Sequence, residues 1–304
     1  MIDDFISKHR LDSGFSTIAQ QWYIPLAEKI NAHHKSAGKA FFVGINGCQG
    51  SGKSTLSDFL LDYLTHTYQL NVVVLSLDDF YLSHAKRTEL AKTCHPLLQT
   101  RGVPGTHDMV KAKEVIQALT SQASSQPSSK ASPKVCSSVK IPRFNKATDD
   151  PYPEAQWSLI NTPVDVVIFE GWCWGVNAQS NAELAPAINT LELTQDKNEF
   201  WRNYVNQKLQ SDYQPLYAMM DYWIMLKAPS FDCVFQWRLQ QERKLATSIA
   251  VKSESKIMNE QQVLDFIQYY QRLTEHGLNT MPKYCDITFS LDRNRQIISA
   301  TNKD

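Results

Sequence analysis

The sequence predicts an α/β fold, a three-layer sandwich in which a parallel β-sheet carries helices on both faces. Short β-branched apolar runs alternate along the chain with segments of helical periodicity. A glycine-rich turn joins the first apolar run directly to a helical segment. The 304 residues, 42% of them hydrophobic, are enough to bury a sizeable core. We predict an N-terminal helical extension over residues 1–39 and one domain over residues 40–304.

The spacing of apolar residues predicts the individual elements. An amphipathic helix is expected over residues 17–34, where apolar side chains recur at helical intervals: Ile18, Trp22, Leu26 and Ile30. A second helix follows the glycine-rich turn, with one apolar face formed by Leu56, Phe59, Leu60 and Leu64. The predicted strands are Ala40–Ile45, Val72–Leu77, Val164–Phe169 and Tyr222–Leu226. Continuous apolar runs such as Val72–Leu77 are typical of strands buried on both faces of a parallel sheet.

Two polar stretches are not expected to contribute to the core. Residues 120–138 are dominated by Ser, with Pro, Ala, Gln and Lys, a composition typical of a flexible surface insertion. The tail after Arg293 is polar and is expected to add little.

The overall composition argues against several classes of partner. Lys plus Arg and Asp plus Glu each number 31, so the zero formal charge gives no electrostatic case for nucleic acid or an acidic membrane. Six scattered cysteines without a C-x-x-C pair predict reduced thiols. The acidic N-terminus does not resemble a signal peptide, and the apolar runs are too short to span a bilayer. We therefore expect a cytoplasmic protein, whose oligomeric state stays open.

The glycine-rich turn matches the phosphate-binding pattern G-x-x-x-x-G-K-[ST] in full, between an apolar strand and a helix. Its glycines allow consecutive N–H groups to point at phosphate oxygens, and the helix N-terminus adds partial positive charge. Lys53 is predicted to reach the β- and γ-phosphates of ATP, and the Ser54 hydroxyl to ligate Mg²⁺. The residues predicted to bind the nucleotide are Gly47, Cys48, Gln49, Gly50, Ser51, Gly52, Lys53, Ser54 and Thr55.

A carboxylate ends the apolar strand Val164–Phe169. Glu170 follows this strand, and the carboxyl ends of parallel strands face the nucleotide in such sheets. Glu170 is therefore predicted to lie near Mg²⁺ or its waters, the alternative being a solvated acid at a strand end. Asp165 lies at the opposite end of the strand and receives no chemical role.

Two adjacent carboxylates, Asp78 and Asp79, follow the strand Val72–Leu77. A hydroxyl acceptor needs a carboxylate opposite the γ-phosphate to take or orient its proton. Neighbouring side chains on an extended backbone point in opposite directions, so one of the two should face the site. Both could instead cap the next segment, because Asp is a common N-cap residue.

These motifs together resemble the P-loop kinases related to uridine kinase, pantothenate kinase and phosphoribulokinase. The chain is more closely similar to the D-glycerate 3-kinase group, which includes plant glycerate kinase and uncharacterised microbial and fungal relatives. The similarity extends from about Phe41 to Leu291. The segments that carry it are Leu90–Ala91, His95–Gln99, Arg101–Asp108, Ile141–Lys146 and Glu170–Gly175.

The resemblance implies an ATP-dependent kinase of a small metabolite, with Mg²⁺ as cofactor. It implies that Asp78 is the general base. The segment Trp237–Lys244 corresponds to the mobile lid of this group, whose arginines Arg238 and Arg243 close over the phosphates. From the residues alone, the same segment is a charged helix surface, which is the more frequent explanation of such a run.

The resemblance also implies D-glycerate as the acceptor. A small carboxylate calls for a nearby cation, ideally an arginine. Arg101, His107 and Arg143 lie in the segments that distinguish this group, and with Asp79 and Tyr81 they form the predicted substrate site.

Two alternatives remain open at this point. The acceptor could be a nucleoside, a pantothenate-like compound or a sugar, and stacking by Trp172, Trp174 or Tyr81 would favour a nucleoside. The chain could also be an ATP-binding regulatory protein without phosphotransfer.

Overall fold

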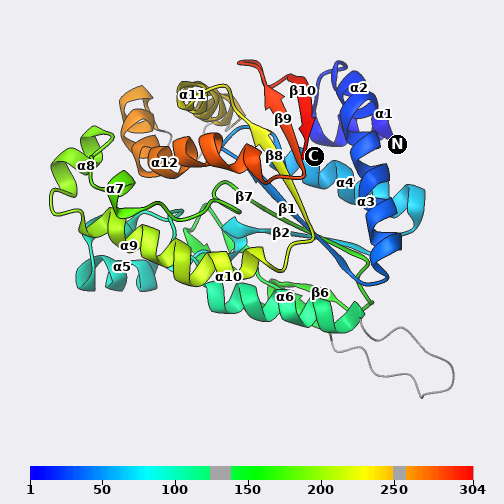
Figure 1. Cartoon of the computed structure of the whole chain (residues 1–304), viewed down its shortest axis with the longest axis horizontal. Helices are drawn as coiled ribbons and strands as arrows, with labels where there is room; N and C mark the ends of the chain where they lie inside the picture. The colour runs from blue at the N-terminus through cyan, green and yellow to red at the C-terminus, as the bar shows by residue number, and fades with distance from the viewer. Residues whose placement is uncertain (124–137, 249–257, 304) are drawn as a thin grey trace.

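The structure, a computed structural model, describes residues 1–123, 138–248 and 258–303. A six-stranded sheet crosses the molecule, and its first five strands in chain order are parallel while the last is antiparallel (Figure 1). In spatial order the strands are β10 (Ile297–Asn302), β9 (Ile287–Leu291), β8 (Tyr222–Lys227), β1 (Phe41–Gly47), β7 (Val166–Gly171) and β2 (Val72–Ser76). The predicted α/β class is confirmed.

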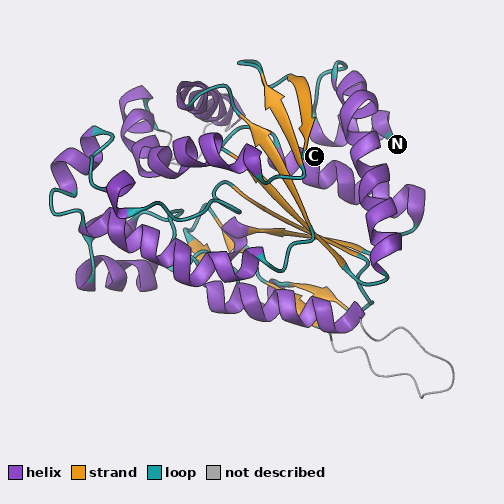
Figure 2. Ribbon diagram, in the orientation of Figure 1, coloured by secondary structure: helices purple, strands orange, loops and turns teal. Residues whose placement is uncertain are grey.

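Helices form a layer on each side of this sheet (Figure 2). Within the described residues, no helix combines the length and hydropathy needed to cross a bilayer. The α-helices are α1 (Ile2–His9), α2 (Phe15–Ile18), α3 (Ile24–Ala37), α4 (Lys53–Tyr68), α5 (His84–Thr93), α6 (Met109–Ala123), α7 (Asn181–Leu184), α8 (Thr190–Gln195), α9 (Phe200–Lys208), α10 (Gln214–Tyr217), α11 (Phe231–Ser248) and α12 (Glu260–Thr280).

Short elements complete the chain. The two-stranded ribbons pair β3 (Val139–Ile141) with β6 (Ser158–Ile160) and β4 (Phe144–Asn145) with β5 (Asp150–Pro151). The 3₁₀ turns are Leu77–Phe80, Pro96–Gln99, Glu154–Gln156 and Met281–Lys283, and the π-helical turns are Ala19–Tyr23 and Leu209–Tyr213.

The core has two layers because side chains alternate across each strand. Val43 and Ile45 of β1 point into one layer, where they meet α1 to α4 and the start of α11. Phe42 points into the other layer, with α6, α9 and α12. β1 and β7 lie in the middle of the sheet and are buried along their whole length, as their continuous apolar sequences predict.

Two predicted elements differ from those observed. The helix expected over residues 17–34 runs from Phe15 to Ala37, and a π-helical turn at Ala19–Tyr23 interrupts it. The strand expected to be buried on both faces, Val72–Ser76, is β2 at the edge of the sheet, and its residues alternate between buried and half-buried. An apolar sequence alone does not reveal which strand lacks a neighbour.

The two polar stretches also behave differently from the prediction. The tail is not negligible, because Ile297–Asn302 forms β10 and pairs antiparallel with β9. Helix α6 continues to Ala123, so the serine-rich insertion begins later than residue 120. The rest of that insertion, residues 124–137, lies outside the described residues.

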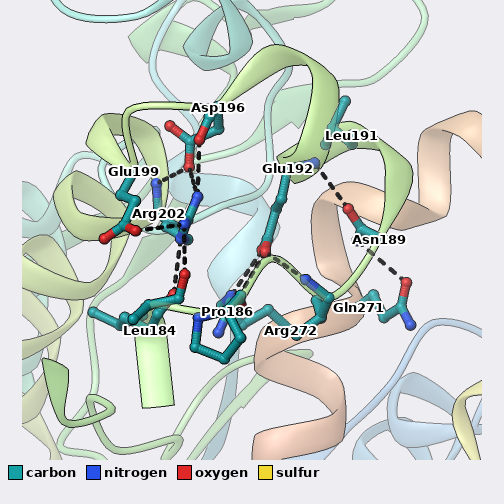
Figure 3. A network of polar contacts seen from close by, with 12 residues as sticks. Leu184, Pro186, Asn189, Leu191, Glu192, Asp196, Glu199, Arg202, Gln271 and Arg272 are labelled. Atoms are coloured by element: carbon teal, nitrogen blue, oxygen red, sulfur yellow. Dashed lines mark hydrogen bonds and ion pairs between the residues drawn. The ribbon is translucent and has the colours of Figure 1, made fainter. Parts of the chain in front are cut away.

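One buried ion pair joins the segment α7 to α9 with α12, and a second holds that segment together (Figure 3). Arg272 on α12 donates to both carboxylate oxygens of Glu192, at 2.7 and 2.6 Å, and to two backbone carbonyls. Arg202 on α9 pairs with Asp196 at 3.0 Å. These groups are almost fully buried, so they depend on each other for solvation.

Candidate functional site

The phosphate loop joins β1 to α4 at the carboxyl edge of the sheet. Gly50 and Gly52 have left-handed φ angles of 81° and 94°, which favour glycine. A Cβ atom on Gly50 would lie 2.8 Å from the Cβ atom of Trp237 on α11, so only glycine allows this approach. The Ser51 hydroxyl is buried and has no hydrogen-bond partner among the described residues. The loop thus combines a tightly bent backbone with a buried hydroxyl, that of Ser51, which has no hydrogen-bond partner among the described residues.

Four side chains meet where the loop, β2 and β7 converge. Glu170, the next-to-last residue of β7, pairs with Ser76 of β2, and its Oε1 accepts hydrogen bonds from Ser76 at 2.9 Å and from Ser54 at 3.2 Å. The Nζ atom of Lys53 lies 3.6 Å from Glu170 Oε2. Burial opposes the charge on Lys53, but the carboxylates of Glu170 and Asp78 outweigh burial and raise the pKa of Lys53. Lys53 therefore stays protonated.

The same atoms form a donor set that suits Mg²⁺. Ser54 Oγ and the Glu170 carboxylate are oxygen donors 3.2 Å apart at the N-terminus of α4. Glu170 Oε2 is buried and has no hydrogen-bond partner among the described residues. A hard divalent cation prefers such oxygen ligands, with water and phosphate oxygens completing its shell. Ser54 and Glu170 are the residues that could hold the ion.

Asp78 and Asp79 have separate surroundings. Asp78 Oδ1 accepts a hydrogen bond from the Tyr81 hydroxyl at 2.6 Å, and Asp78 Oδ2 accepts one from Lys146 Nζ at 2.5 Å. Burial would raise the pKa of the Asp78 carboxyl, but Lys146, Lys53 and the Tyr81 hydroxyl outweigh burial and hold that pKa below its usual range. Asp78 is thus an ionised carboxylate within the field of Lys53.

Asp79 instead fastens the segment that follows β3. It accepts hydrogen bonds from the Phe144 backbone N–H at 3.0 Å and from Arg143 at 3.1 Å. Burial raises the pKa of Asp79, while Phe144 and Arg143 oppose that rise. Of the two adjacent acids, Asp78 is the one whose charge raises the pKa of Lys53, and Lys53 in turn lowers the pKa of Asp78.

A cluster of cations lies next to Asp78. Asp149 ion-pairs with both Arg87, at 2.7 Å, and Arg101. The Arg101 guanidinium also lies over the rings of Tyr81 and Phe144, at 5.9 and 5.7 Å from their centroids. Two guanidinium groups share one carboxylate here, so the three groups together carry one net positive charge. This charge is adjacent to the ring whose hydroxyl binds Asp78.

His107 is buried beside Tyr81, with ring centroids 4.7 Å apart. The Tyr213 hydroxyl accepts from the Gly105 N–H at 3.3 Å and lies 2.6 Å from His107 Nδ1. Donation from Tyr213 to Nδ1 places the imidazole proton on Nε2, which has no hydrogen-bond partner among the described residues. Burial lowers the pKa of His107 to about 3, so the ring is neutral.

No contact links the predicted lid arginines to the phosphate loop among the residues that the structure describes. Trp237 supplies the contact between α11 and the loop, and it is buried. Arg238 ion-pairs with Glu242 on its own helix, and its guanidinium lies 5.6 Å from the centroid of the Phe266 ring on α12. Arg243 is exposed. Their role over the phosphates stays a prediction.

The structure brings the predicted residues together except for these two arginines, and it adds groups that the sequence did not single out. Lys146, Ser76, Asp149 and Tyr213 all contact predicted site residues. Lys146 and Ser76 lie within segments that had been singled out, Ile141–Lys146 and the strand Val72–Leu77, but no local pattern pointed to their partners.

The aromatic candidates for stacking on a nucleoside belong to the core. Trp172 and Trp174 are 4% and 0% exposed, and Trp174 stacks on Phe169. Trp172 donates its indole N–H to the carbonyl of Gly102. Neither ring is available as a platform for a ligand in this structure.

Comparisons with known proteins find similarity to kinases. No protein-family model matches the sequence. The chain is 35% identical over 249 residues to an uncharacterised kinase of Schizosaccharomyces pombe, covering 78% of this chain and 80% of that protein. It is 30% identical to the chloroplastic D-glycerate 3-kinase of Arabidopsis thaliana, covering 75% of this chain and 45% of that protein. The solved structure of D-glycerate 3-kinase from Cryptococcus neoformans matches with a TM-score of 0.76 and 25% identity, covering 94% of this chain and 99% of that one.

Proposed function

The chain belongs to the group of P-loop kinases that includes D-glycerate 3-kinases, and we propose that it transfers the γ-phosphate of ATP to a hydroxyl of D-glycerate. That it is an ATP-dependent small-molecule kinase follows from its relatives and from its fold. The identity of the acceptor and the roles of individual residues are the proposal.

The observation that carries the proposal is the pairing of a carboxylate base with a surplus cation on the acceptor side. Asp78 is ionised, so it can accept a proton, as a general base must. It also interacts electrostatically with Lys53, the lysine of the phosphate loop, as expected for a base close to the γ-phosphate. Arg101, Arg87 and Asp149 carry one net positive charge beside Tyr81. A small acid binds between them by placing its carboxylate on the guanidinium and its hydroxyl on Asp78. Neutral acceptors would leave that charge without a partner.

The chemistry follows from these positions. Asp78 accepts the proton of the acceptor hydroxyl while the oxygen bonds to the γ-phosphorus and the bond from the γ-phosphorus to the bridging oxygen of ADP breaks. Lys53 and the N–H groups of the loop stabilise the charge on the transferring phosphoryl group. Ser54 and Glu170 would hold Mg²⁺, which would supply further neutralisation of the phosphate oxygens. His107 offers its Nε2–H as a donor near the acceptor.

The test is an acceptor panel in a coupled assay of ADP release. The panel contains D-glycerate, L-glycerate, glycerol, pantothenate, uridine, ribulose 5-phosphate and fructose, with a reaction lacking an acceptor as background. We expect turnover with D-glycerate that exceeds every other acceptor, and a phosphorylated product confirmed by mass spectrometry. Faster turnover of uridine or fructose would refute the proposed acceptor and leave the kinase assignment intact. Equal, slow ADP release in every reaction would refute phosphotransfer to any of these compounds.

A further inference from the structure

Both carboxylate oxygens of the proposed base are already engaged. Asp78 Oδ1 accepts a hydrogen bond from the Tyr81 hydroxyl at 2.6 Å, and Asp78 Oδ2 accepts one from the Lys146 ammonium at 2.5 Å. An ammonium at this distance stabilises the ionised carboxylate, so it lowers the proton affinity on which a base depends. An acceptor hydroxyl must approach the same carboxylate. One of the two existing contacts has to yield.

The two partners differ in how easily they can leave. Tyr81 is 8% exposed, its ring contacts the tilted His107 ring and the edge-on Phe144 ring, and its hydroxyl is therefore fixed. The Lys146 side chain is 60% exposed and reaches Asp78 from a turn. Exposed ion pairs contribute little stability, and the lysine side chain is flexible. Lys146 is therefore the partner that can exchange.

The backbone around Lys146 keeps this side chain near the acceptor site. The Asn145 side chain accepts hydrogen bonds from the N–H groups of Ala147 and Thr148, which fixes the turn after β4. Three residues beyond Lys146, Asp149 is held by Arg101 and by a second arginine. Hydrogen bonds and ion pairs thus fix the backbone of the turn on both sides of Lys146. The exposed Lys146 side chain can still change its position. It pairs with the base and belongs to the same turn as Asp149, the partner of Arg101.

We propose that Lys146 masks Asp78 until an anionic acceptor arrives, and then moves its ammonium from Asp78 to the carboxylate of that acceptor. The exchange preserves one ion pair and releases one oxygen of the base. A neutral alcohol offers no carboxylate, so Lys146 stays on Asp78 and the base stays masked. The enzyme thus selects hydroxy acids in two ways: it binds their carboxylate, and only they release Asp78 to act as the base. This inference rests on the proposed function.

The experiment compares Lys146→Met with wild type, using D-glycerate and glycerol as an acid and its closest neutral counterpart. Loss of a charged contact predicts that kcat/KM for D-glycerate falls about 10- to 100-fold. Because Asp78 is unmasked, kcat/KM for glycerol and ATP hydrolysis without an acceptor stay constant or rise. The ratio between the two acceptors therefore collapses. Lys146→Arg keeps the charge and should retain most of the ratio.

The matched control is Lys140→Met. Lys140 on β3 has similar exposure, 52%, and pairs with Glu154 at 2.7 Å, away from Asp78. This variant should keep the wild-type acceptor ratio and melting temperature. Equal losses for D-glycerate and glycerol in Lys146→Met would assign Lys146 a structural role and overturn the exchange. An unchanged ratio would overturn it as well.

Failure of the proposed acceptor is distinguishable from failure of this inference. If wild type phosphorylates a different acid, D-glycerate is the wrong acceptor, and the same comparison is made between that acid and its amide. A collapsed ratio in Lys146→Met then still supports the exchange. Without turnover, thermal shift measurements with an ATP analogue report whether any acid binds wild type more tightly than Lys146→Met. A preference of wild type for neutral acceptors, or no acid bound more tightly, overturns the inference.

Discussion

Replacing Asp78 by Asn is expected to lower kcat about 100- to 1,000-fold. The substitution is nearly isosteric, and Asn Oδ1 can still accept the hydrogen bond that Tyr81 donates at 2.6 Å. The amide cannot take a proton, so the contribution of a general base is lost. We expect the lower part of the usual range of about 10² to 10⁴ because Lys146 and Lys53 already hold the pKa of Asp78 low. A weak base contributes less when it is removed.

Asp79→Asn provides the comparison at the neighbouring position. Asn can still accept the Phe144 N–H but loses the ion pair with Arg143, which is 45% exposed. The expected cost is about 1 kcal/mol or less of folding free energy and less than about a tenfold loss of kcat. Both variants should bind ATP as wild type does, because neither residue belongs to the phosphate loop.

Three measurements on the same preparations test whether Asp78 is the general base: kcat by the coupled assay, ATP affinity by calorimetry, and the melting temperature. The reasoning is wrong if Asp78→Asn keeps more than about a tenth of wild-type kcat, given the magnitude expected for base removal. It is also wrong if Asp79→Asn loses more activity than Asp78→Asn. A melting temperature that falls strongly in Asp78→Asn would assign the loss to folding.

Arg272→Met leaves the fully buried Glu192 carboxylate without its guanidinium, so stability should fall by about 3–5 kcal/mol. Calorimetric melting should then occur about 6–15 °C lower, and a shift under about 2 °C would contradict this. Gly50→Ala should weaken ATP binding by at least about tenfold because the new Cβ meets α11 at 2.8 Å. Gly38→Ala, also at a left-handed φ but with nothing within 4 Å of its Cβ, should bind ATP normally by calorimetry. Because burial lowers the pKa of His107 to about 3, below its unfolded value, only the unfolded chain protonates this group as pH falls below about 6.5. Stability from His107 is thus present above that pH and decreases by about 1.4 kcal/mol per unit below it. Urea unfolding between pH 7.5 and 5 should show a shallower decrease for His107→Gln than for wild type, and parallel curves would contradict it.

The position and backbone geometry of the phosphate loop could be predicted because they depend on consecutive residues. Glycines at fixed positions, a lysine and a serine determine how a short backbone segment bends after a strand. The acid near the carboxyl end of β7, Glu170, was predictable for a similar reason, since an apolar run followed by an acid is a local pattern, although β7 itself continues to Gly171. These features place the site at the carboxyl edge of a parallel sheet without any knowledge of the sheet order.

The position of each strand in the sheet could not be predicted in the same way. β2 is as apolar as the central strands but lies at the edge, and β10 comes from a polar tail that pairs with β9. Strand pairing is satisfied by backbone groups, so the side chains of one strand carry little information about its neighbours. The serine-rich composition likewise marked an insertion, but helix α6 continues to Ala123.

The sequence by itself determined the fold class, the nucleotide-binding loop and the pair of acids of which one serves as the candidate base. From the residues alone Asp78 and Asp79 were equivalent candidates, and the tertiary structure gives them different partners, because it brings Lys146, 68 residues away, onto one and the Arg143 segment onto the other. It also gathered Arg87, Arg101 and Asp149 into one cationic cluster. The physical reason is that charge and burial act through space, whereas a sequence motif records only neighbours along the chain.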